Sequence, residues 1–215
     1  MNTAQSQSSL IASLTEELEP VRQFSARDGA LWVALAVAAT AAGVYFNRGF
    51  WTGIFEGQAS PFFWITNGLL ILLGLAAATA VVSMASPKVG NRYDAPRWAS
   101  AMITVLPIAA IISALAGSHD ADHMVSGLAE YCFTNSVATS IIVAGALTLW
   151  LRRGAPVSLN LAGWFTGMAA GAMGTAIYGL SCPIDSVMHL GVAHVMPVAA
   201  TAIVGRIVVP FLVRW

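Results

Sequence analysis

Residues 61–84 read PFFWITNGLLILLGLAAATAVVSM, a run without a single charged side chain. A helix rises about 1.5 Å per residue, so about 20 apolar residues are needed to cross the roughly 30 Å hydrocarbon core of a bilayer. This run is long enough to do so. The whole chain has the same character, because 57% of its residues are hydrophobic and only 9% are charged, against roughly 25% charged in ordinary soluble domains.

Five further stretches resemble this one in length and composition. The only Lys or Arg inside any of the six is Arg206, near the end of the last, where a long side chain reaches the headgroups. The six predicted spans are Ala30–Phe46, Pro61–Met84, Trp98–Ala116, Cys132–Leu151, Val157–Leu180 and Val187–Leu212. The sequence therefore predicts an all-α protein, with a six-helix transmembrane bundle over residues 30–215 and a short cytoplasmic segment over residues 1–29.

The basic residues predict the orientation of the bundle. If the N-terminus lies inside the cell, all of the ten Lys and Arg residues except Arg48 fall on cytoplasmic segments. They are Arg22, Arg27, Lys88, Arg92, Arg97, Arg152, Arg153, Arg206 and Arg214. The positive-inside rule then predicts a multi-pass protein of the bacterial inner membrane with both termini in the cytoplasm. The formal net charge is zero, which gives no electrostatic reason to expect direct binding of nucleic acid.

The N-terminal segment contains a short amphipathic pattern. Its apolar residues Leu10, Ile11, Leu14 and Leu18 fall on one helical face, whereas Glu16, Glu17 and Glu19 lie elsewhere. Pro20 is expected to end the helix. Helices that lie on membranes usually carry Lys and Arg on the polar face, so an acidic face favours docking on a basic protein partner. An inert tail and a lipid contact remain the alternatives.

The chain has two cysteines, and the predicted topology places both on the outer side. Cys132 stands at the head of the fourth span and Cys182 lies between the fifth and the sixth. The compartment outside the bacterial inner membrane favours disulfides, and two thiols at one depth can pair if their Cα atoms come within about 7 Å. The alternatives are that the thiols bind a metal or that each packs as a small apolar residue.

Candidate metal ligands accompany the cysteines on this side. Thiolate, imidazole and carboxylate groups together suit Cu or Zn, so transient binding of either ion at the cysteines is one interpretation. The candidates are His119, His123, Asp185, His189 and His194. The alternative is that the loop residues are merely solvated and that His194 is a satisfied interior histidine. In the fifth span, the spacing of Gly163, Gly167, Gly171 and Gly174 predicts close helix packing.

Other functional classes are weakly supported. The sequence has no phosphate-binding glycine loop and no Ser-His-Asp pattern, so we expect neither an enzyme nor a permanent cofactor. A transporter or channel would usually show polar groups in mid-membrane, and here the candidates are few: Asn67, Pro107, His194 and Pro197. A membrane thiol oxidoreductase would typically present C-x-x-C, whereas these cysteines stand alone.

Three stretches resemble the NrsF family of bacterial membrane anti-sigma factors. They are LIASLTEELEPVRQ at residues 10–23, CPIDSVMHLGVAH at residues 182–194, and VMPVAATAIVGRIVVPFLVRW at residues 195–215. Their order and spacing within a six-span frame agree with the family over essentially the whole chain.

The resemblance implies a function for each end of the molecule. A cytoplasmic N-terminus, here residues 1–29, would hold an extracytoplasmic-function sigma factor at the membrane. We assign the contact to Leu10, Ile11, Leu14, Glu16, Glu17 and Leu18. Two outward-facing cysteines, here Cys132 and Cys182, would sense oxidant or metal stress and cause release of the sigma factor.

Overall fold

The computed structural model describes residues 3–16, 25–87, 90, 93–115 and 128–214. Every regular element within these ranges is a helix, which confirms the predicted all-α class. Five helical segments of the described part are long and apolar enough to cross a membrane: Ala26–Arg48, Pro61–Met84, Asp94–Ile112, Ala129–Arg152 and His189–Val213.

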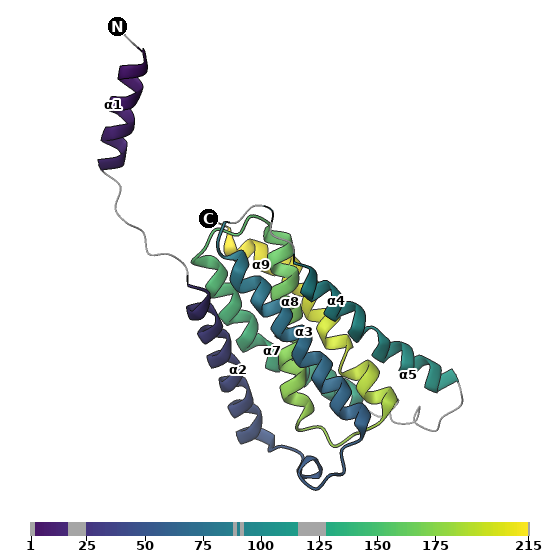
Figure 1. Cartoon of the computed structure of the whole chain (residues 1–215). Helices are drawn as coiled ribbons and strands as arrows, with labels where there is room; N and C mark the ends of the chain where they lie inside the picture. Colours follow the sequence, from purple (N-terminus) through teal and green to yellow (C-terminus); the bar gives the residue numbers. More distant parts are fainter. Residues whose placement is uncertain (1–2, 17–24, 88–89, 91–92, 116–127, 215) are drawn as a thin grey trace.

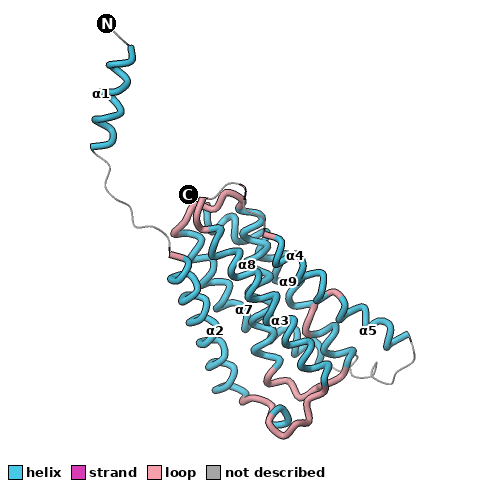
Figure 2. Tube along the Cα trace, viewed as in Figure 1, coloured by secondary structure: helices cyan, strands magenta, loops and turns pink. Residues whose placement is uncertain are grey.

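The helices form one elongated bundle, from which the first helix stands apart (Figure 1). This separate helix is α1 (Thr3–Glu16). The bundle contains α2 (Ala26–Arg48), α3 (Pro61–Met84), α4 (Asp94–Ile103), α5 (Val105–Leu115), α7 (Leu128–Arg152), α8 (Leu159–Gly179), the π-helix η3 (His189–Ala193) and α9 (Met196–Val213). Figure 2 shows that the connections within the bundle gather at its two ends, one of which holds the C-terminus.

Local sequence signals explain where the helices start and stop. At the start of α3, the Ser60 hydroxyl accepts a hydrogen bond from the Phe63 backbone N–H, and Pro61 occupies the first turn, where a missing N–H does no harm. Ser25 caps α2 in the same way. At the other end of α2, Gly49 has φ of 74°, a left-handed conformation in which glycine avoids the steric penalty of a side chain.

Two of the predicted spans differ from the continuous helices that the sequence predicts. The third divides at Thr104 into α4 and α5. This division lies about one turn before Pro107, which has no backbone N–H to donate to a carbonyl of the preceding turn. The sixth begins with η3 and becomes an α-helix only at Met196, where Pro197 occupies the first turn. Prolines therefore lie at both irregularities.

Helix α8 is the centre of the bundle and packs against α3, α7 and α9. Nearly all of its residues from Ala162 to Gly179 are buried. Because protein surrounds it, α8 does not need large apolar side chains, and it is built mainly from Gly, Ala, Thr and Met. This composition lowers its hydropathy, and α8 is accordingly not among the five segments that qualify as spans by hydropathy alone.

The glycines of α8 allow its neighbours to approach, as their spacing predicts. A Cβ atom at Gly167 would meet the backbone of Thr201 and Ala202 in α9, and one at Gly174 would meet Ser140 in α7. Gly205 of α9 faces the backbone of Gly163 and Gly167 in return. The prediction of close packing is confirmed, and it brings α7 and α9 to backbone contact with α8.

We expect Gly167→Ala to destabilise the bundle, because the added methyl group would push α9 away from α8. Overpacking of this kind typically costs about 1–3 kcal/mol. The measurement is the temperature at which the detergent-solubilised full-length protein loses its monomer peak in size-exclusion chromatography.

The matched control is Gly145→Ala in α7, where no atom lies within 4 Å of the added Cβ. That variant should melt at the wild-type temperature or slightly above it, since alanine favours a helix over glycine by up to about 1 kcal/mol. Equal melting temperatures for the two variants would show that the α8–α9 approach does not limit stability.

Candidate functional site

Four side chains, one from α7 and three from the segment after α8, meet at the end of the bundle where α8 stops. They are Cys132, Cys182, His189 and His194, and one ligand atom from each, a sulfur or a ring nitrogen, lies within 4.8 Å of the other three. The exposed fractions are 4% and 2% for the two cysteines and zero for both histidines. We call these four residues the Cys/His cluster.

The distances inside the Cys/His cluster are short. The two sulfur atoms lie 3.6 Å apart as free thiols, and Sγ of Cys182 lies 3.4 Å from Nε2 of His189. The rings of His189 and His194 pack edge to face with centroids 5.2 Å apart. Because the Cys182 thiol hydrogen-bonds to Cys132 and is buried, its pKa lies well above the ordinary value for cysteine.

Each member of the cluster is positioned by a different local structure. Cys132 lies one turn inside α7. Cys182 follows the end of α8, where its N–H donates to the carbonyl of Gly179 in a tightened final turn. In an α-helix, side chains five residues apart point to different faces, but the wider π-helix η3 brings His189 and His194 together.

Most of the ring nitrogens in the cluster lack a partner within the described residues. Neither Nδ1 nor Nε2 of His194 has a hydrogen bond, and Nδ1 of His189 has none either. A buried polar group without a partner costs about 1–3 kcal/mol. Such groups in a native fold call for an explanation, of which an ion or a functional role are two.

The structure places the other predicted site residues as follows. Asp185 accepts hydrogen bonds from the backbone and the hydroxyl group of Ser60, which join the loop after α8 to the start of α3. It is therefore engaged outside the Cys/His cluster. His119 and His123 lie outside the described residues.

The predicted partner-binding residues belong to α1 and the segment after it. Leu10, Ile11 and Leu14 expose 59%, 62% and 56% of their surface, and Glu16 is exposed at the end of the helix. Glu17 and Leu18 lie outside the described residues.

Sequence reasoning missed an aromatic link between α2 and the Cys/His cluster. The Arg48 guanidinium lies 4.5 Å from the centroid of the Tyr131 ring and 5.8 Å from that of Tyr178. It also donates to the side chain of Asn135 at 3.3 Å. The hydroxyl group of Tyr178 in turn lies 4.0 Å from Sγ of Cys132. The signal available in the sequence was that Arg48 is the single basic residue on its side of the predicted topology.

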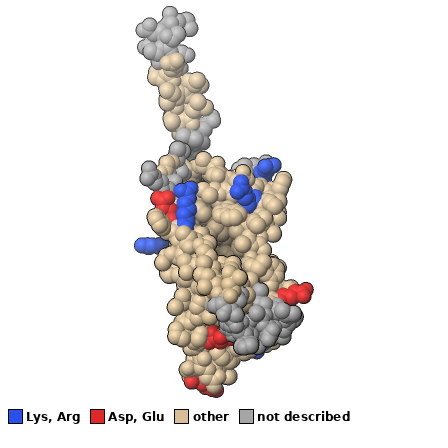
Figure 3. Space-filling view, turned by 90° about the vertical axis from the view of Figure 1, so that its right-hand side faces the viewer, with Lys and Arg blue, Asp and Glu red and all other residues tan. Residues whose placement is uncertain are grey.

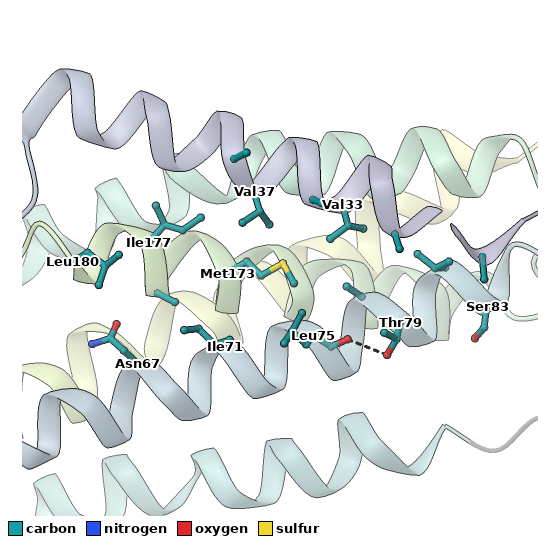
Figure 4. Close-up of a pocket in the computed structure, with 17 residues that line it drawn as sticks. Val33, Val37, Asn67, Ile71, Leu75, Thr79, Ser83, Met173, Ile177 and Leu180 are labelled. Atoms are coloured by element: carbon teal, nitrogen blue, oxygen red, sulfur yellow. Dashed lines mark hydrogen bonds between the residues drawn. The ribbon is translucent and has the colours of Figure 1, made fainter. Parts of the chain in front are cut away.

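An apolar groove of about 780 Å³ runs between α2, α3 and α8. Figure 4 shows Val33 and Val37 of α2 opposite Ile71 and Leu75 of α3, with Met173 and Ile177 of α8 at the base. The groove contains no member of the Cys/His cluster, but the two are neighbours. Asn67, at one end of the groove, and His194 both lie against the backbone of Gly179.

Comparison with known proteins gives a consistent result. A family model described as "Negative regulator of sigma F" (NrsF) matches residues 14–215. The anti-sigma-F factor NrsF of Caulobacter vibrioides (strain NA1000 / CB15N) is 31% identical over 168 residues, which cover 74% of this chain and 76% of that protein. No solved structure matches the chain.

We expect a thiol oxidant such as diamide to join Cys132 to Cys182 within one chain. The sulfur atoms must approach from 3.6 Å to about 2.0 Å, a movement that side-chain rotation and a small helix shift supply. The measurement is the loss of both thiols to a polymer-linked maleimide, read as a gel shift of the full-length protein.

Cys182→Ser is the control, because its remaining thiol should still react with maleimide after the same oxidant treatment. If the wild-type protein kept both thiols, or formed only dimers between chains, the proximity of the two sulfur atoms would be refuted.

Proposed function

Because this chain belongs to the NrsF family of negative regulators of sigma F, we propose that it is an inner-membrane anti-sigma factor controlled by its Cys/His cluster. Family membership makes the protein an anti-sigma factor whose partner is a sigma factor, and a regulator rather than a catalyst. This agrees with the prediction that the chain is not an enzyme. The partner that we propose is an extracytoplasmic-function sigma factor, held at the cytoplasmic face and released under stress.

The outer surface of the bundle supports insertion in a membrane. Large apolar side chains on several helices point outward, among them Leu31, Leu72, Ile112, Ile207 and Phe211, each exposed by half or more. In water such a surface would be costly, whereas lipid is its natural surrounding. We count α8 as the sixth span, shielded by the other helices. Lipid chains would also line the apolar groove between α2, α3 and α8.

The charge distribution supports the proposed orientation. On the face shown in Figure 3, the basic side chains gather toward the end of the bundle from which α1 extends. The other end carries Glu56 in the loop between α2 and α3, Glu130 in the first turn of α7 and Asp185 after α8, with Arg48 at the end of α2 as the basic residue of the described part there. The positive-inside rule puts the basic end, with both termini, in the cytoplasm and the Cys/His cluster on the outer side.

Helix α1 is the segment that we propose binds the sigma factor. Its three large apolar side chains are exposed by more than half, and a helix of 14 residues gains little stability without a partner. An apolar stripe bordered by carboxylates suits a hydrophobic groove with a basic rim.

Chemistry at Cys132 and Cys182 is the proposed trigger, either oxidation of the thiols to a disulfide or capture of a thiophilic metal. Both would tie α7 to the loop that follows α8. A hundredfold change in sigma-factor occupancy requires about 2.7 kcal/mol of differential free energy. By restricting the chain, a disulfide typically contributes about 2–4 kcal/mol of stability. The free energy available from the disulfide is therefore large enough for such a change in occupancy.

The link through Arg48 supports a route from the cluster to the sigma-binding end. Tyr178 contacts both Cys132 and Arg48, and Arg48 is the last residue of α2. Just beyond it, the N–H of Trp51 donates to the carbonyl of Leu180 at 2.8 Å. A shift of α7 against α8 would thus move α2, whose other end leads to α1.

We expect charges on the apolar face of α1 to release the sigma factor without any stress. In the full-length protein, Leu10→Glu with Leu14→Glu would bury carboxylates in the interface. Co-purification of a tagged extracytoplasmic-function sigma factor from the same cell should fall at least tenfold, equivalent to about 1.4 kcal/mol. Deletion of residues 1–24, which spares the Ser25 cap of α2, should abolish it.

The matched control is Ser8→Glu with Ala12→Glu, which adds the same two charges at the same spacing on the opposite face of α1. This variant should retain the sigma factor. If the deletion variant also retained it, the binding surface would lie elsewhere and the assignment to α1 would be wrong.

We expect oxidation of the wild-type complex by diamide to release the sigma factor in parallel with the loss of the two thiols. Cys182→Ser should bind the sigma factor but keep it after oxidation. Arg48→Met keeps a long side chain without charge, and it should form the disulfide yet release the sigma factor less. Release from oxidised Cys182→Ser would disprove the cysteine trigger, and full release from Arg48→Met would disprove the route.

A further inference from the structure

We propose that Cys132, Cys182, His189 and His194 together form a closed, four-coordinate site for a divalent d¹⁰ metal ion, of which Zn²⁺ is the model. The inference concerns the same Cys/His cluster as the proposed function. It rests on the proposed function only in assigning the bound ion a role in regulation. It adds two histidine ligands and an ion class to the thiol pair.

Two of the separations between ligand atoms are close to the edges of a tetrahedron. Zn–S and Zn–N bonds of about 2.3 and 2.0 Å place two thiolates about 3.8 Å apart, and a thiolate and an imidazole about 3.5 Å apart. The observed separations are 3.6 Å between the sulfur atoms and 3.4 Å between Sγ of Cys182 and Nε2 of His189. Both lie within about 0.2 Å of the tetrahedral edges. Cys182 therefore already has tetrahedral spacing to Cys132 and His189, and no other pair of ligand atoms is more than 4.8 Å apart, so each would close by at most about 1.5 Å on binding.

The unpartnered histidines are an independent observation that points to the same ion. His194 is completely buried and neither of its ring nitrogens has a hydrogen bond within the described residues. A histidine retained only for packing would normally find a partner for at least one nitrogen. Coordination satisfies one nitrogen of each histidine and explains why a polar ring occupies this interior position.

The two thiolates, the two imidazoles and their burial together favour a divalent ion. Two thiolates and two neutral imidazoles around a divalent ion give a complex without net charge, which is favourable at a buried site. The same donors around Cu⁺ would leave one negative charge in the interior. A two-coordinate Cu⁺ site would need the thiolates alone and would leave both histidines unused. Tetrahedral S₂N₂ donors are typical of zinc.

Binding must displace the thiol protons. One divalent ion replaces the protons of Cys132 and Cys182, two protons leave the site, and both imidazoles stay neutral. No electrons are exchanged. The bound thiolates are then not available to form a disulfide, so the metal-bound and the oxidised states of the cluster exclude each other.

The site is closed, which favours a structural or sensing ion over a catalytic one. All four ligands come from the protein, and catalytic zinc sites usually keep one position open for water or substrate. Asp185 is the carboxylate that the sequence analysis named as a candidate ligand, and it accepts hydrogen bonds from Ser60 instead. The ion would join α7, the end of α8 and η3 at one point.

The experiment uses the reduced full-length protein in detergent, incubated with Zn²⁺ and freed of excess ion. We expect one Zn²⁺ per chain, and an X-ray absorption spectrum with two sulfur ligands at about 2.3 Å and two nitrogen ligands at about 2.0 Å. Absence of stoichiometric zinc would overturn the proposal. A first shell of oxygen and nitrogen alone, or of sulfur alone, would do the same.

Variants then test the histidines. His194→Ala should weaken Zn²⁺ binding by about 100-fold or more, since even loss of a partner outside the ligand shell costs 10- to 100-fold. Gly145→Ala is the control, because this position lies several turns further along α7 than Cys132, its added Cβ meets no neighbouring helix, and the substitution spares every ligand. Unchanged affinity in His194→Ala would show that the thiols act alone.

Sigma-factor retention in the same preparations separates this proposal from the proposed function. A variant that keeps the wild-type melting temperature in size-exclusion chromatography has a folded bundle, so its loss of zinc is a loss of the site. Stoichiometric S₂N₂ zinc in a protein whose reduced, metal-free form retains no sigma factor would refute the anti-sigma mechanism and leave the metal site standing. Sigma-factor retention without zinc would refute only the metal site.

Discussion

The close approach of α8 to its neighbours is the constraint on which the rest of the structure depends. Gly163 and Gly167 meet the backbone of α9, and Gly174 meets that of α7. In the membrane that we propose as the surroundings of the bundle, apolar side chains gain little from leaving the solvent, so packing at backbone distance has to provide the stability. The same contacts fix where α7 and α9 stand relative to the end of α8, which is where the Cys/His cluster lies.

The cluster is accordingly a junction of three elements. Cys132 comes from α7, Cys182 from the turn after α8, and the histidines from η3 and the residue that follows it. Any bond formed across the cluster, whether between the two sulfur atoms or through an ion, changes the relative positions of these three elements. Because interfaces packed at backbone distance do not deform gradually, a small shift at the junction is expected to move whole helices. Arg48, held over Tyr131 and Tyr178, places α2 within reach of such a shift.

The sequence predicted the membrane-spanning segments better than it predicted the composition of the Cys/His cluster. Charge-free runs predicted six spans, five of which are long and apolar enough to cross a membrane, and glycine spacing identified the packing face of α8, because both signals depend on composition and period alone. Likewise, the positions of Cys132 and Cys182 suggested a pair. The role of His189 and His194 was only partly predictable, since an α-helical period separates side chains five residues apart and the π-helix η3 was not foreseen. The contacts of Asp185 with Ser60, across 125 residues, carry no local signal at all.

Burial of the thiols favours the proposed sensor over the rival functions. A thiol oxidoreductase must expose a sulfur atom to its substrate protein, and the cysteines here are 4% and 2% exposed. A transporter needs polar groups along a path through the membrane, but the large groove is lined almost entirely by apolar side chains, with Asn67, Thr79 and Ser83 as the exceptions. Small oxidants and metal ions can reach an enclosed site that excludes proteins. Enclosure also makes the free energy of any change in charge at the cluster large. A regulator that converts one chemical event into the movement of helices needs a large free-energy change of this kind.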